Sequence, residues 1–399
     1  MAETYHILTL NPISQLGLKH FPHNYIIGNP MSEPDAILVR SQNMHEMSVP
    51  AKVKAIGRAG AGTNNIPVAG MSKRGVPVFN APGANANAVK ELVIAAMLMA
   101  ARNLVPAMHF VENISGDEAA IKKGVEDGKK QFGGIELPHR SLGVIGLGAI
   151  GGLVADAAIK LGMRVIGFDP EITVDAAWNV PSQVKKAHSI DEVLKNCDYV
   201  TLHVPLLDGT RKMLDAKRLS HMKYGAVLLN FARNEVVDED AVLAALNTKN
   251  IKYYMCDFPS IRLRGHPAVV ALPHLGASTQ EAEDNCAVMV VEQVRDFLEN
   301  GNILNAVNFP SVVMERESPY RVGIANANVP NMVGQISTAM AQASLNIHNM
   351  VNKSRGETAY TLVDLDSVVP GAVISKISAI PGVLSVRYVP QQGDDQESQ

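Results

Sequence analysis

The stretch "SLGVIGLGAIGGLV" (residues 141–154) indicates the fold of the middle of the chain. Its apolar start has the composition of a buried strand and leads directly into the pattern G-x-G-x-x-G, formed by Gly146, Gly148 and Gly151. The first glycine permits a tight turn, the second lets the backbone approach a pyrophosphate, and the third lets the next helix pack closely on the strand. Free N–H groups at the start of that helix suit phosphate oxygens. The stretch therefore predicts a dinucleotide-binding turn.

An acidic residue, Asp169, ends the next strand-like run. Its carboxylate can accept hydrogen bonds from the ribose hydroxyls of a dinucleotide, and its charge would repel a 2′-phosphate. The two residues that follow, Pro170 and Glu171, bring no basic group. NAD is therefore expected rather than NADP. The alternative is an aspartate that merely ends a strand.

Further strand-like runs follow, with helical stretches at residues 189–195 and 238–246 between them. The runs are apolar throughout rather than alternating, as expected when both faces of a parallel sheet are covered. We therefore expect a Rossmann fold, a doubly wound parallel α/β sheet. The runs are "MRVIGFD", "CDYVTLHVP", "GAVLLNFAR", "KYYMCDF" and "AVVALPH".

The chain on either side of this sheet predicts two more structural regions. Before it, strand-like runs closed by Gly, Pro or Ser alternate with helical stretches, which implies further parallel βα units, and residues 87–104 are strongly helical. After it come an amphipathic helix (279–299) and a linker-like segment, "NFPSVVMERESP" (308–319). The order βαββαβ then follows within about seventy residues, which predicts a small separate domain. The N-terminal runs are "YHILTL", "AILVRS", "VKAIGRAG" and "VPVFNAPG".

Composition excludes several classes of protein. A length of 399 residues favours two or three domains, and 47% hydrophobic with 19% charged residues describes a packed globular protein. A net charge of -3 with mixed signs argues against a nucleic-acid or membrane-surface binder. The longest apolar run (92–101) is about half of the ~20 residues that cross a bilayer, and the N-terminus lacks a signal-peptide pattern. The three cysteines are odd in number and lie in apolar segments, so we expect buried, reduced thiols and a cytoplasmic protein.

Two residues at strand ends could carry redox chemistry on a hydroxy acid. Arg233 ends "VLLNFAR" and can bind a carboxylate with two parallel hydrogen bonds. His274 ends "VVALPH" and is suited to proton transfer near neutral pH. Open α/β sheets bind ligands at the carboxyl ends of their strands, where both residues are expected. Taken alone, each has a simpler interpretation as a surface ion-pair residue or an ordinary histidine.

Together these motifs resemble the D-2-hydroxyacid dehydrogenase family. "GLGAIG" (146–151), "NFARNEVVDE" (230–239) and "PHLGAST" (273–279) stand in that family's order. "IGRAGAGTNNI" (56–66) and "NAPGANANAVKELV" (80–93) are similar to the substrate loop and the following segment of the members that oxidise 3-phosphoglycerate. The βαββαβ unit resembles an ACT domain, an amino-acid-sensing module. The resemblance covers nearly all of residues 1–390.

The resemblance implies a domain organisation and a set of site residues. A split, flavodoxin-like substrate domain would comprise residues 1–97 and 283–312, the NAD-binding domain 98–282, the ACT domain 318–390, and a disordered tail 391–399. Arg233 would bind the carboxylate and polarise the C2 oxygen, and His274 would be the acid/base. Arg58 and the Gly60 backbone would face the substrate carboxylate, and Arg40 is the candidate for the phosphate end. The cofactor-binding residues would be Gly146, Gly148, Ala149, Ile150, Gly151, Asp169, Val204, Pro205, Phe231, Ala232, Asp257, Gly276 and Ala277.

The sequence departs from the family at two positions of this site. The family has a glutamate five residues beyond Asp257 that hydrogen-bonds the catalytic histidine, and this chain has Arg262 there. A missing carboxylate removes a group that stabilises the imidazolium. The second departure is Asn234, where glycine usually follows the arginine. We interpret the chain as an enzyme with a weakened or substituted orienting group.

The ACT resemblance adds a regulatory expectation. Asn328 and Asn346 stand where serine-inhibited relatives hold serine, with Asn326 at a third polar position. The alternative is that these asparagines only cap helices and loops. Asn331 replaces the glycine that usually opens the first helix, which could weaken feedback or change the effector.

The sequence is compatible with three functions. The first is NAD-dependent oxidation of 3-phosphoglycerate to 3-phosphohydroxypyruvate, the entry step to serine. The second is action on another 2-hydroxy acid such as 2-hydroxyglutarate. The third is an NAD- and amino-acid-binding sensor without turnover. The expected partners are small molecules and further copies of the chain, as a homodimer or homotetramer, with neither nucleic acid, membrane nor metal.

Overall fold

The computed structural model describes residues 3–391 and divides the chain into two compact units. The terminal unit comprises Met1–Asn85 with Gln280–Gln399, and the central unit comprises Ala86–Thr279. The first boundary lies before helix α3 (Ala86–Ala101), not after residue 97, because Val89, Val93 and Met97 on this helix pack into the core of the central unit. The expected disordered tail falls almost entirely on residues 392–399, which lie outside the described part of the chain.

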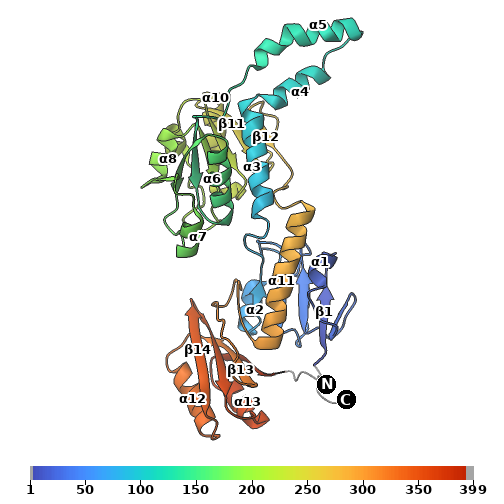
Figure 1. Cartoon of the computed structure of the whole chain (residues 1–399), viewed down its shortest axis with the longest axis vertical. Helices are drawn as coiled ribbons and strands as arrows, with labels where there is room; N and C mark the ends of the chain where they lie inside the picture. Colours follow the sequence, from blue (N-terminus) through green and yellow to red (C-terminus); the bar gives the residue numbers. More distant parts are fainter. Residues whose placement is uncertain (1–2, 392–399) are drawn as a thin grey trace. The chain divides into compact units, whose positions relative to one another are not determined.

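The central unit has one seven-stranded sheet in the order β12-β11-β10-β9-β6-β7-β8, and its strand pairs are all parallel. Strands β11 and β12 of this sheet are labelled in Figure 1. The strand order reverses beside β6, which makes the edge between β6 and β9 the switch point where such sheets bind ligands. The predicted doubly wound sheet is therefore confirmed. The strands are β6 (Ser141–Ile145), β7 (Arg164–Phe168), β8 (Lys185–Lys186), β9 (Tyr199–Leu202), β10 (Ala226–Asn230), β11 (Ile251–Cys256) and β12 (Val269–Ala271).

Two hydrophobic cores cover the two faces of this sheet. Adjacent residues of one strand point to opposite faces, so Val144 belongs to the core under α3 and α6 (Ala149–Lys160), and Ile145 belongs to the other core. This double burial explains why the strands are apolar without alternation. The second core is covered by α8 (Ile190–Asn196), α9 (Ala216–Ser220) and α10 (Glu239–Asn247).

An excursion of the central unit was not predicted from the sequence. It comprises α4 (Leu104–Glu112), α5 (Glu118–Gly128) and the short helix η1 (Lys129–Phe132), and none of its helical residues is buried. A further short helix, α7 (Val174–Asn179), also has no buried residue. Within residues 3–391 no single helix is long and apolar enough to cross a membrane; α3 and α4 meet that criterion only as a pair bent by 67°.

The terminal unit begins with a five-stranded parallel sheet in the order β2-β1-β3-β4-β5. The long helix α11 (Gln280–Asn300) packs on it, and Gly57 allows the close approach, because a Cβ there would lie 2.7 Å from Val290. The predicted βα units are confirmed, although the edge strand β2 was missed. The elements are β1 (Tyr5–Thr9), α1 (Gln15–Leu18), β2 (Tyr25–Gly28), β3 (Ala36–Val39), β4 (Ala55–Arg58), α2 (Val68–Lys73) and β5 (Val78–Phe79).

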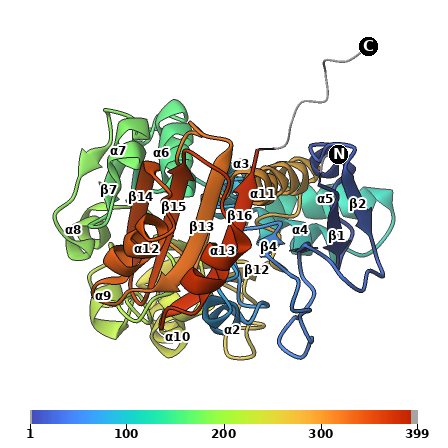
Figure 2. The ribbon, with the colours of Figure 1, turned by 90° about the horizontal axis from the view of Figure 1, so that it is seen from below.

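The C-terminal part of the terminal unit has the predicted order βαββαβ. Its four strands form an antiparallel sheet in the order β14-β15-β13-β16, with both helices over the same face (Figure 2). The elements are β13 (Tyr320–Ala327), α12 (Met332–Ala341), β14 (Ile347–Arg355), β15 (Thr358–Leu365), α13 (Gly371–Ser378) and β16 (Val383–Pro390). We call this part the C-terminal domain.

The second face of that sheet is buried as well. Val322 and Ile324 of β13 point toward the two helices, whereas Ala325 belongs to the core that contains α11. Tyr360 and Leu362 of β15 join the same core. The predicted linker at 308–319 forms no helix or named strand, yet it is packed rather than free, since Phe309 and Val312 are fully buried.

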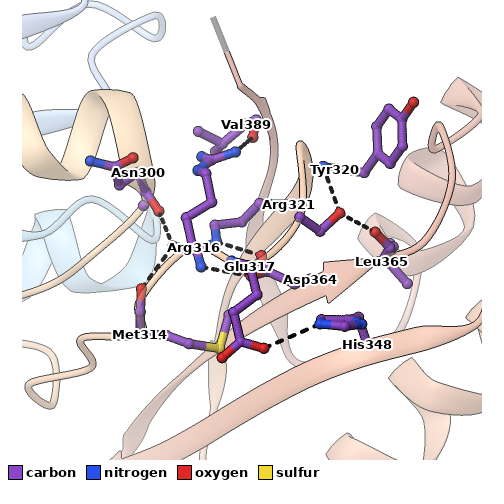
Figure 3. A network of polar contacts seen from close by, with 12 residues as sticks. Asn300, Met314, Arg316, Glu317, Tyr320, Arg321, His348, Asp364, Leu365 and Val389 are labelled. Carbon is purple, nitrogen blue, oxygen red and sulfur yellow. Dashed lines mark hydrogen bonds and ion pairs between the residues drawn. The ribbon is translucent and has the colours of Figure 1, made fainter.

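A polar network fixes the C-terminal domain to α11 (Figure 3). Arg321 and Asp364 form a completely buried ion pair with Nε–Oδ1 and Nη2–Oδ2 distances of 2.6 and 2.8 Å. The last carbonyls of a helix lack partners within the helix and carry partial negative charge. Here five consecutive carbonyls, Phe297 to Gly301, accept hydrogen bonds from side chains of the linker and the C-terminal domain. These side chains are Arg387, Arg316, Arg321 and Tyr360.

Candidate active site

Each of the three glycines in the turn between β6 and α6 has a different structural role. Gly146 has φ +92°, which favours glycine, and a Cβ there would lie 2.3 Å from the His203 carbonyl. A Cβ on Gly151 would lie 1.9 Å from the Gly146 carbonyl, so this glycine permits helix and strand to touch. A Cβ on Gly148 would meet nothing within 4 Å, which leaves this side open for a ligand at the N-terminus of α6. The turn therefore fits a pyrophosphate.

Asp169 follows β7 and supports this turn directly. Its Oδ2 accepts a hydrogen bond from the Leu147 N–H at 2.8 Å, and its Oδ1 accepts one from the Glu171 N–H at 3.0 Å. The carboxylate is thereby held beside the glycine turn with lone pairs left for ribose hydroxyls. This position fits the cofactor role predicted for Asp169.

Arg233 lies in the loop after β10, and the buried Asn230 fixes that loop. The Asn230 side chain donates to the Arg233 carbonyl at 2.9 Å and to the Tyr254 hydroxyl at 3.2 Å, and it accepts from the Ala232 N–H. The Arg233 Nη1 donates to the Ala232 carbonyl at 2.6 Å. Asn230 was not predicted as a site residue, although an amide at the end of an apolar strand signals a hydrogen-bonding role, because an unpaired polar group there would be costly.

Asp257 lies beside the charges of both candidate catalytic residues. It is 1% exposed, its Oδ2 accepts from the Gly276 N–H at 3.4 Å, and its Oδ1 is buried without a partner among the described residues. Burial raises the pKa of Asp257, and the positive charges of His274 and Arg233 oppose that rise. The unpaired oxygen fits a donor such as the carboxamide N–H of a nicotinamide.

His274 is exposed at the end of the segment after β12. Its ring packs against Phe258, with the ring centroids 4.9 Å apart, and among residues 3–391 no carboxylate forms an ion pair with it. His203, at the end of β9, is not a competing acid/base, because burial lowers its pKa to about 3 and keeps the ring neutral. His274 is therefore the histidine available for proton transfer at this edge of the sheet.

Arg262 does not stand beside the histidine. Its Nε and Nη2 bind the Asp240 carboxylate of α10 at 2.6 and 2.5 Å, so the expectation that residue 262 occupies the orienting position is wrong. Asn234, the other departure, donates to the Glu239 carboxylate at 3.0 Å and opens the short helix η2 (Asn234–Val236).

The remaining predicted cofactor residues of the central unit lie in three short segments at the carboxyl ends of strands and in the first turn of α6. Phe231 and Ala232 are buried, and Pro205 is exposed. Gly276 lies beside Asp257, because a Cβ on this glycine would be in van der Waals contact with Asp257 Oδ2 at 3.4 Å. The predicted residues in these segments are Ala149, Ile150, Val204, Pro205, Phe231, Ala232, Gly276 and Ala277.

The terminal unit carries the other predicted substrate residues at the carboxyl ends of β3 and β4. The Arg58 Nε donates to the Arg40 carbonyl at 3.0 Å, and the Arg40 Nη2 lies 2.6 Å from Glu283 Oε1. Gly60 has φ +151°, and a Cβ there would collide with the Arg58 guanidinium. Its N–H donates to the Arg58 carbonyl at 2.8 Å, so it does not present a free donor to a substrate.

The asparagines expected to form an effector site are not brought together within one chain. The Asn328 side chain donates to the Gly356 carbonyl at the end of β13, whereas Asn346 precedes β14 beside Asp366, at the opposite end of the sheet. Asn326 is 1% exposed, and its Oδ1 has no partner among the described residues. Asn331 has φ 64°, a left-handed conformation that explains why glycine is usual there. Among residues 3–391, no group of three or more His, Cys, Asp or Glu is arranged to hold a metal ion.

Comparisons with known proteins agree with this geometry. Residues 94–276 match the family model of the D-isomer specific 2-hydroxyacid dehydrogenase, NAD binding domain. The chain is 32% identical over 350 residues to the D-3-phosphoglycerate dehydrogenase of Haemophilus influenzae, covering 85% of this chain and 82% of that protein. It is 34% identical over 347 residues to the D-3-phosphoglycerate dehydrogenase of Methanocaldococcus jannaschii, with 84% of this chain and 62% of that longer protein covered.

Solved structures show the same fold. The NAD+-bound 3-phosphoglycerate dehydrogenase of Entamoeba histolytica superposes with a TM-score of 0.58 at 24% identity, covering 76% of this chain and 98% of that one. The D-mandelate dehydrogenase of Rhodotorula graminis superposes with a TM-score of 0.65 at 21% identity, covering 78% and 100%. At these identities the likeness concerns the fold alone.

Proposed function

The chain belongs to the D-isomer-specific 2-hydroxyacid dehydrogenase family, and we propose that it catalyses the NAD-dependent oxidation of 3-phospho-D-glycerate to 3-phosphohydroxypyruvate, the first step of L-serine biosynthesis. One observation carries the chemistry: Arg233, Asp257 and His274 gather at the carboxyl edge of the sheet that bears the glycine turn. Relatives named D-3-phosphoglycerate dehydrogenase, which are 31–34% identical to this chain over most of its length, support the choice of substrate.

The two catalytic residues act on different atoms of the substrate. The Arg233 guanidinium binds the carboxylate with parallel hydrogen bonds and polarises the C2 oxygen. His274 accepts the proton of the C2 hydroxyl as the C2–H bond breaks, and it returns a proton to that oxygen in the reverse reaction. Bound NAD supplies the acceptor for the hydride that leaves C2. The two electrons and one proton of the C–H bond thus leave C2, and the hydroxyl proton leaves through the histidine.

Asp257 compensates for the missing glutamate. Neither Asp257 nor Glu235 is hydrogen-bonded to the His274 ring, but the ring is close enough for its positive charge to oppose the raised pKa of Asp257. By the same attraction, an ionised Asp257 stabilises the imidazolium that forms during the reaction. Packing against Phe258 then orients the ring. This arrangement favours an active enzyme over a sensor without turnover.

Arg40 favours a phosphorylated substrate over 2-hydroxyglutarate. A phosphate carries about -1.5 to -2 charges at pH 7, and arginine pairs with it through a fork of N–H donors. Arg40, directly after β3, supplies positive charge for such a group, whereas Arg58 at the end of β4 is assigned to the substrate carboxylate. The distal carboxylate of 2-hydroxyglutarate carries a single negative charge, so it requires less positive charge around it.

A spectrophotometric assay with NADH and 3-phosphohydroxypyruvate tests the proposed function. We expect kcat/KM for the NADH-dependent reduction of 3-phosphohydroxypyruvate to be at least tenfold higher than kcat/KM for the reduction of 2-oxoglutarate. Binding of NADH without turnover of either keto acid would instead establish a sensor, and the reverse order of efficiencies would establish the 2-hydroxyglutarate alternative.

Cofactor choice gives a second test. We expect strong preference for NADH over NADPH, because the fixed carboxylate of Asp169 accepts from ribose hydroxyls and repels a 2′-phosphate. Asp169→Ala should narrow the ratio of the two kcat/KM values by at least about tenfold, equal to about 1.4 kcal/mol. Asp175→Ala, a nearby exposed aspartate of α7, should leave the ratio unchanged. Equal efficiency of the two cofactors in the wild type would contradict the assignment.

The C-terminal domain is proposed to be an ACT domain that binds L-serine. Asn328 and Asn346 lie at opposite ends of its sheet, so a site that uses both requires two copies of the chain and fits a homodimer or homotetramer. Calorimetry with L-serine tests this: heat in the wild type that is lost in Asn346→Ala supports it, and the absence of heat contradicts it.

The three cysteines are free and buried, which fits a reducing compartment such as the cytoplasm.

A further inference from the structure

The guanidinium of Arg40 is already paired with a carboxylate of its own chain. Arg40 Nη2 lies 2.6 Å from Oε1 of Glu283, and both side chains are a little over one third exposed. Arg40 follows β3, and Glu283 lies in the first turn of α11. The cation that the proposed function assigns to the substrate phosphate is therefore held by an internal anion.

The loop of Arg40 is fixed independently of this pair. The Asn11 Oδ1 accepts hydrogen bonds from the N–H groups of Arg40, Ser41 and Gln42 at 2.9, 3.1 and 3.1 Å. The Arg40 carbonyl accepts from Arg58 Nε at 3.0 Å. The backbone that carries the guanidinium thus has little freedom to carry it away from Glu283.

The helix of Glu283 is fixed at both ends. Near its start, Asp284 accepts a hydrogen bond from the hydroxyl of Ser14, the residue that precedes α1. A Cβ on Gly17 of α1 would lie 2.5 Å from Ala287, so α1 and α11 are in backbone contact there. At the far end, the carbonyls of residues 297–301 are bonded to the linker and the C-terminal domain. The Arg40–Glu283 pair is therefore built into the unit rather than formed by two loose surface side chains.

We propose that Glu283 is a specificity-determining residue that lowers the affinity of the enzyme for the phosphate of its substrate. The inference rests on the proposed function, because it takes Arg40 as a phosphate ligand. An incoming phosphate must displace the Glu283 carboxylate from the Arg40 guanidinium, so the carboxylate opposes phosphate binding by competing for that cation. Substrates without a second anionic group do not meet this opposition.

The effect should appear in KM and not in kcat. The phosphate does not change during the reaction, so its contacts stabilise the bound substrate and the transition state equally. Removing a carboxylate that opposes those contacts strengthens both to the same degree. A residue with a general structural role would instead change kcat, or change KM for every substrate alike.

Glu283→Gln in the full-length enzyme tests the proposal. With NADH saturating, we expect KM for 3-phosphohydroxypyruvate to fall about threefold to fivefold, the size of a partly exposed ion pair. The kcat value, and KM for unphosphorylated hydroxypyruvate, should stay within about twofold. Glu281→Gln is the matched control, since Glu281 lies in the same helical turn, is exposed and forms no ion pair among residues 3–391. It removes the same charge and should change neither KM.

A double-mutant cycle separates the failure of this proposal from that of the proposed function. In an Arg40→Ala background, Glu283→Gln should have no effect on either KM, because the carboxylate then has no guanidinium to occupy. If Arg40→Ala raises KM for the phosphorylated substrate alone but Glu283→Gln leaves it unchanged or raises it, Arg40 binds phosphate and the role of Glu283 is refuted. If Arg40→Ala affects both substrates alike, the phosphate assignment fails, and the inference fails with it.

Discussion

Replacing Arg233 with alanine should lower kcat/KM for 3-phosphohydroxypyruvate by about 100-fold to 1,000-fold, while the affinity for NADH stays within about threefold. Asn230 holds the backbone of Arg233 at the carboxyl end of β10, and the guanidinium donates to the Ala232 carbonyl. It binds the substrate carboxylate and the oxygen on which negative charge develops, so its loss affects binding and chemistry together.

Steady-state kinetics and fluorescence titration of NADH measure the two halves of this prediction. Arg233→Lys retains the charge but not the planar fork, and it should recover only part of the lost rate. Arg211→Ala removes an exposed arginine from the same unit and should change neither quantity by more than about twofold. A wild-type rate in Arg233→Ala would show that the substrate carboxylate binds elsewhere. A loss confined to NADH affinity would make Arg233 a cofactor ligand.

The sequence was sufficient for the architecture because apolar periodicity and glycine placement are local signals. The strand from Ser141 to Ile145, the turn at Gly146 and the long helix α11 all lie close to their predicted positions. Each of these positions has a physical requirement that one residue type meets, and the structure shows that requirement. The positive φ of Gly146 and the contact of Gly151 with its carbonyl are examples.

Side-chain partnerships could not be predicted in the same way. Counting five residues from Asp257 placed Arg262 beside the histidine, but the structure pairs Arg262 with Asp240, which precedes it by 22 positions. The helices α4 and α5 were missed because each contains a residue of low helix propensity, Pro106 in α4 and Gly124 in α5.

The packing of the segment 308–319 could not be predicted from its local sequence either. Its prolines and charges are typical of a mobile linker, yet Arg316 donates to the carbonyls of Glu299 and Val389. A charged residue is predicted to be exposed unless its partner is known, and these partners lie 17 and 73 positions away. Only the tertiary structure reveals that the charges of this segment hold the C-terminal domain.

Asp364→Asn should destabilise the terminal unit by about 3–5 kcal/mol, the cost of leaving a buried charge without its counter-ion. Arg321 is completely buried and keeps its positive charge, and an amide cannot neutralise it. Calorimetric unfolding of the full chain should show a lower transition temperature, and the amides of β13 and β15 should exchange hydrogen faster. Asp366→Asn alters an exposed aspartate two positions away and should cost less than about 0.5 kcal/mol.

Replacing both partners should recover only part of this loss. A buried ion pair can often be exchanged for apolar side chains without cost. Arg321, however, also donates to the carbonyls of Asn300, Met314 and Glu315, at 3.1, 3.0 and 2.9 Å. The double variant Arg321→Met with Asp364→Leu removes the unpaired charge but leaves these three carbonyls without their donor. A double variant as stable as the wild type would show that the three hydrogen bonds contribute nothing.

The dependence on pH provides a separate test of the same pair. Burial alone would raise the pKa of Asp364, but the hydrogen bonds and charge of Arg321 outweigh burial, so the pKa is lowered in the folded chain. A carboxylate with a lowered pKa stabilises the fold above its unfolded pKa, about 3.9, and this stabilisation is lost as the pH falls through the folded value. The difference in stability between wild type and Asp364→Asn should therefore be constant from pH 8 to about pH 5 and should shrink below about pH 4. A difference that persists unchanged at pH 3 would mean that the variant acts through packing and not through the charge of the pair.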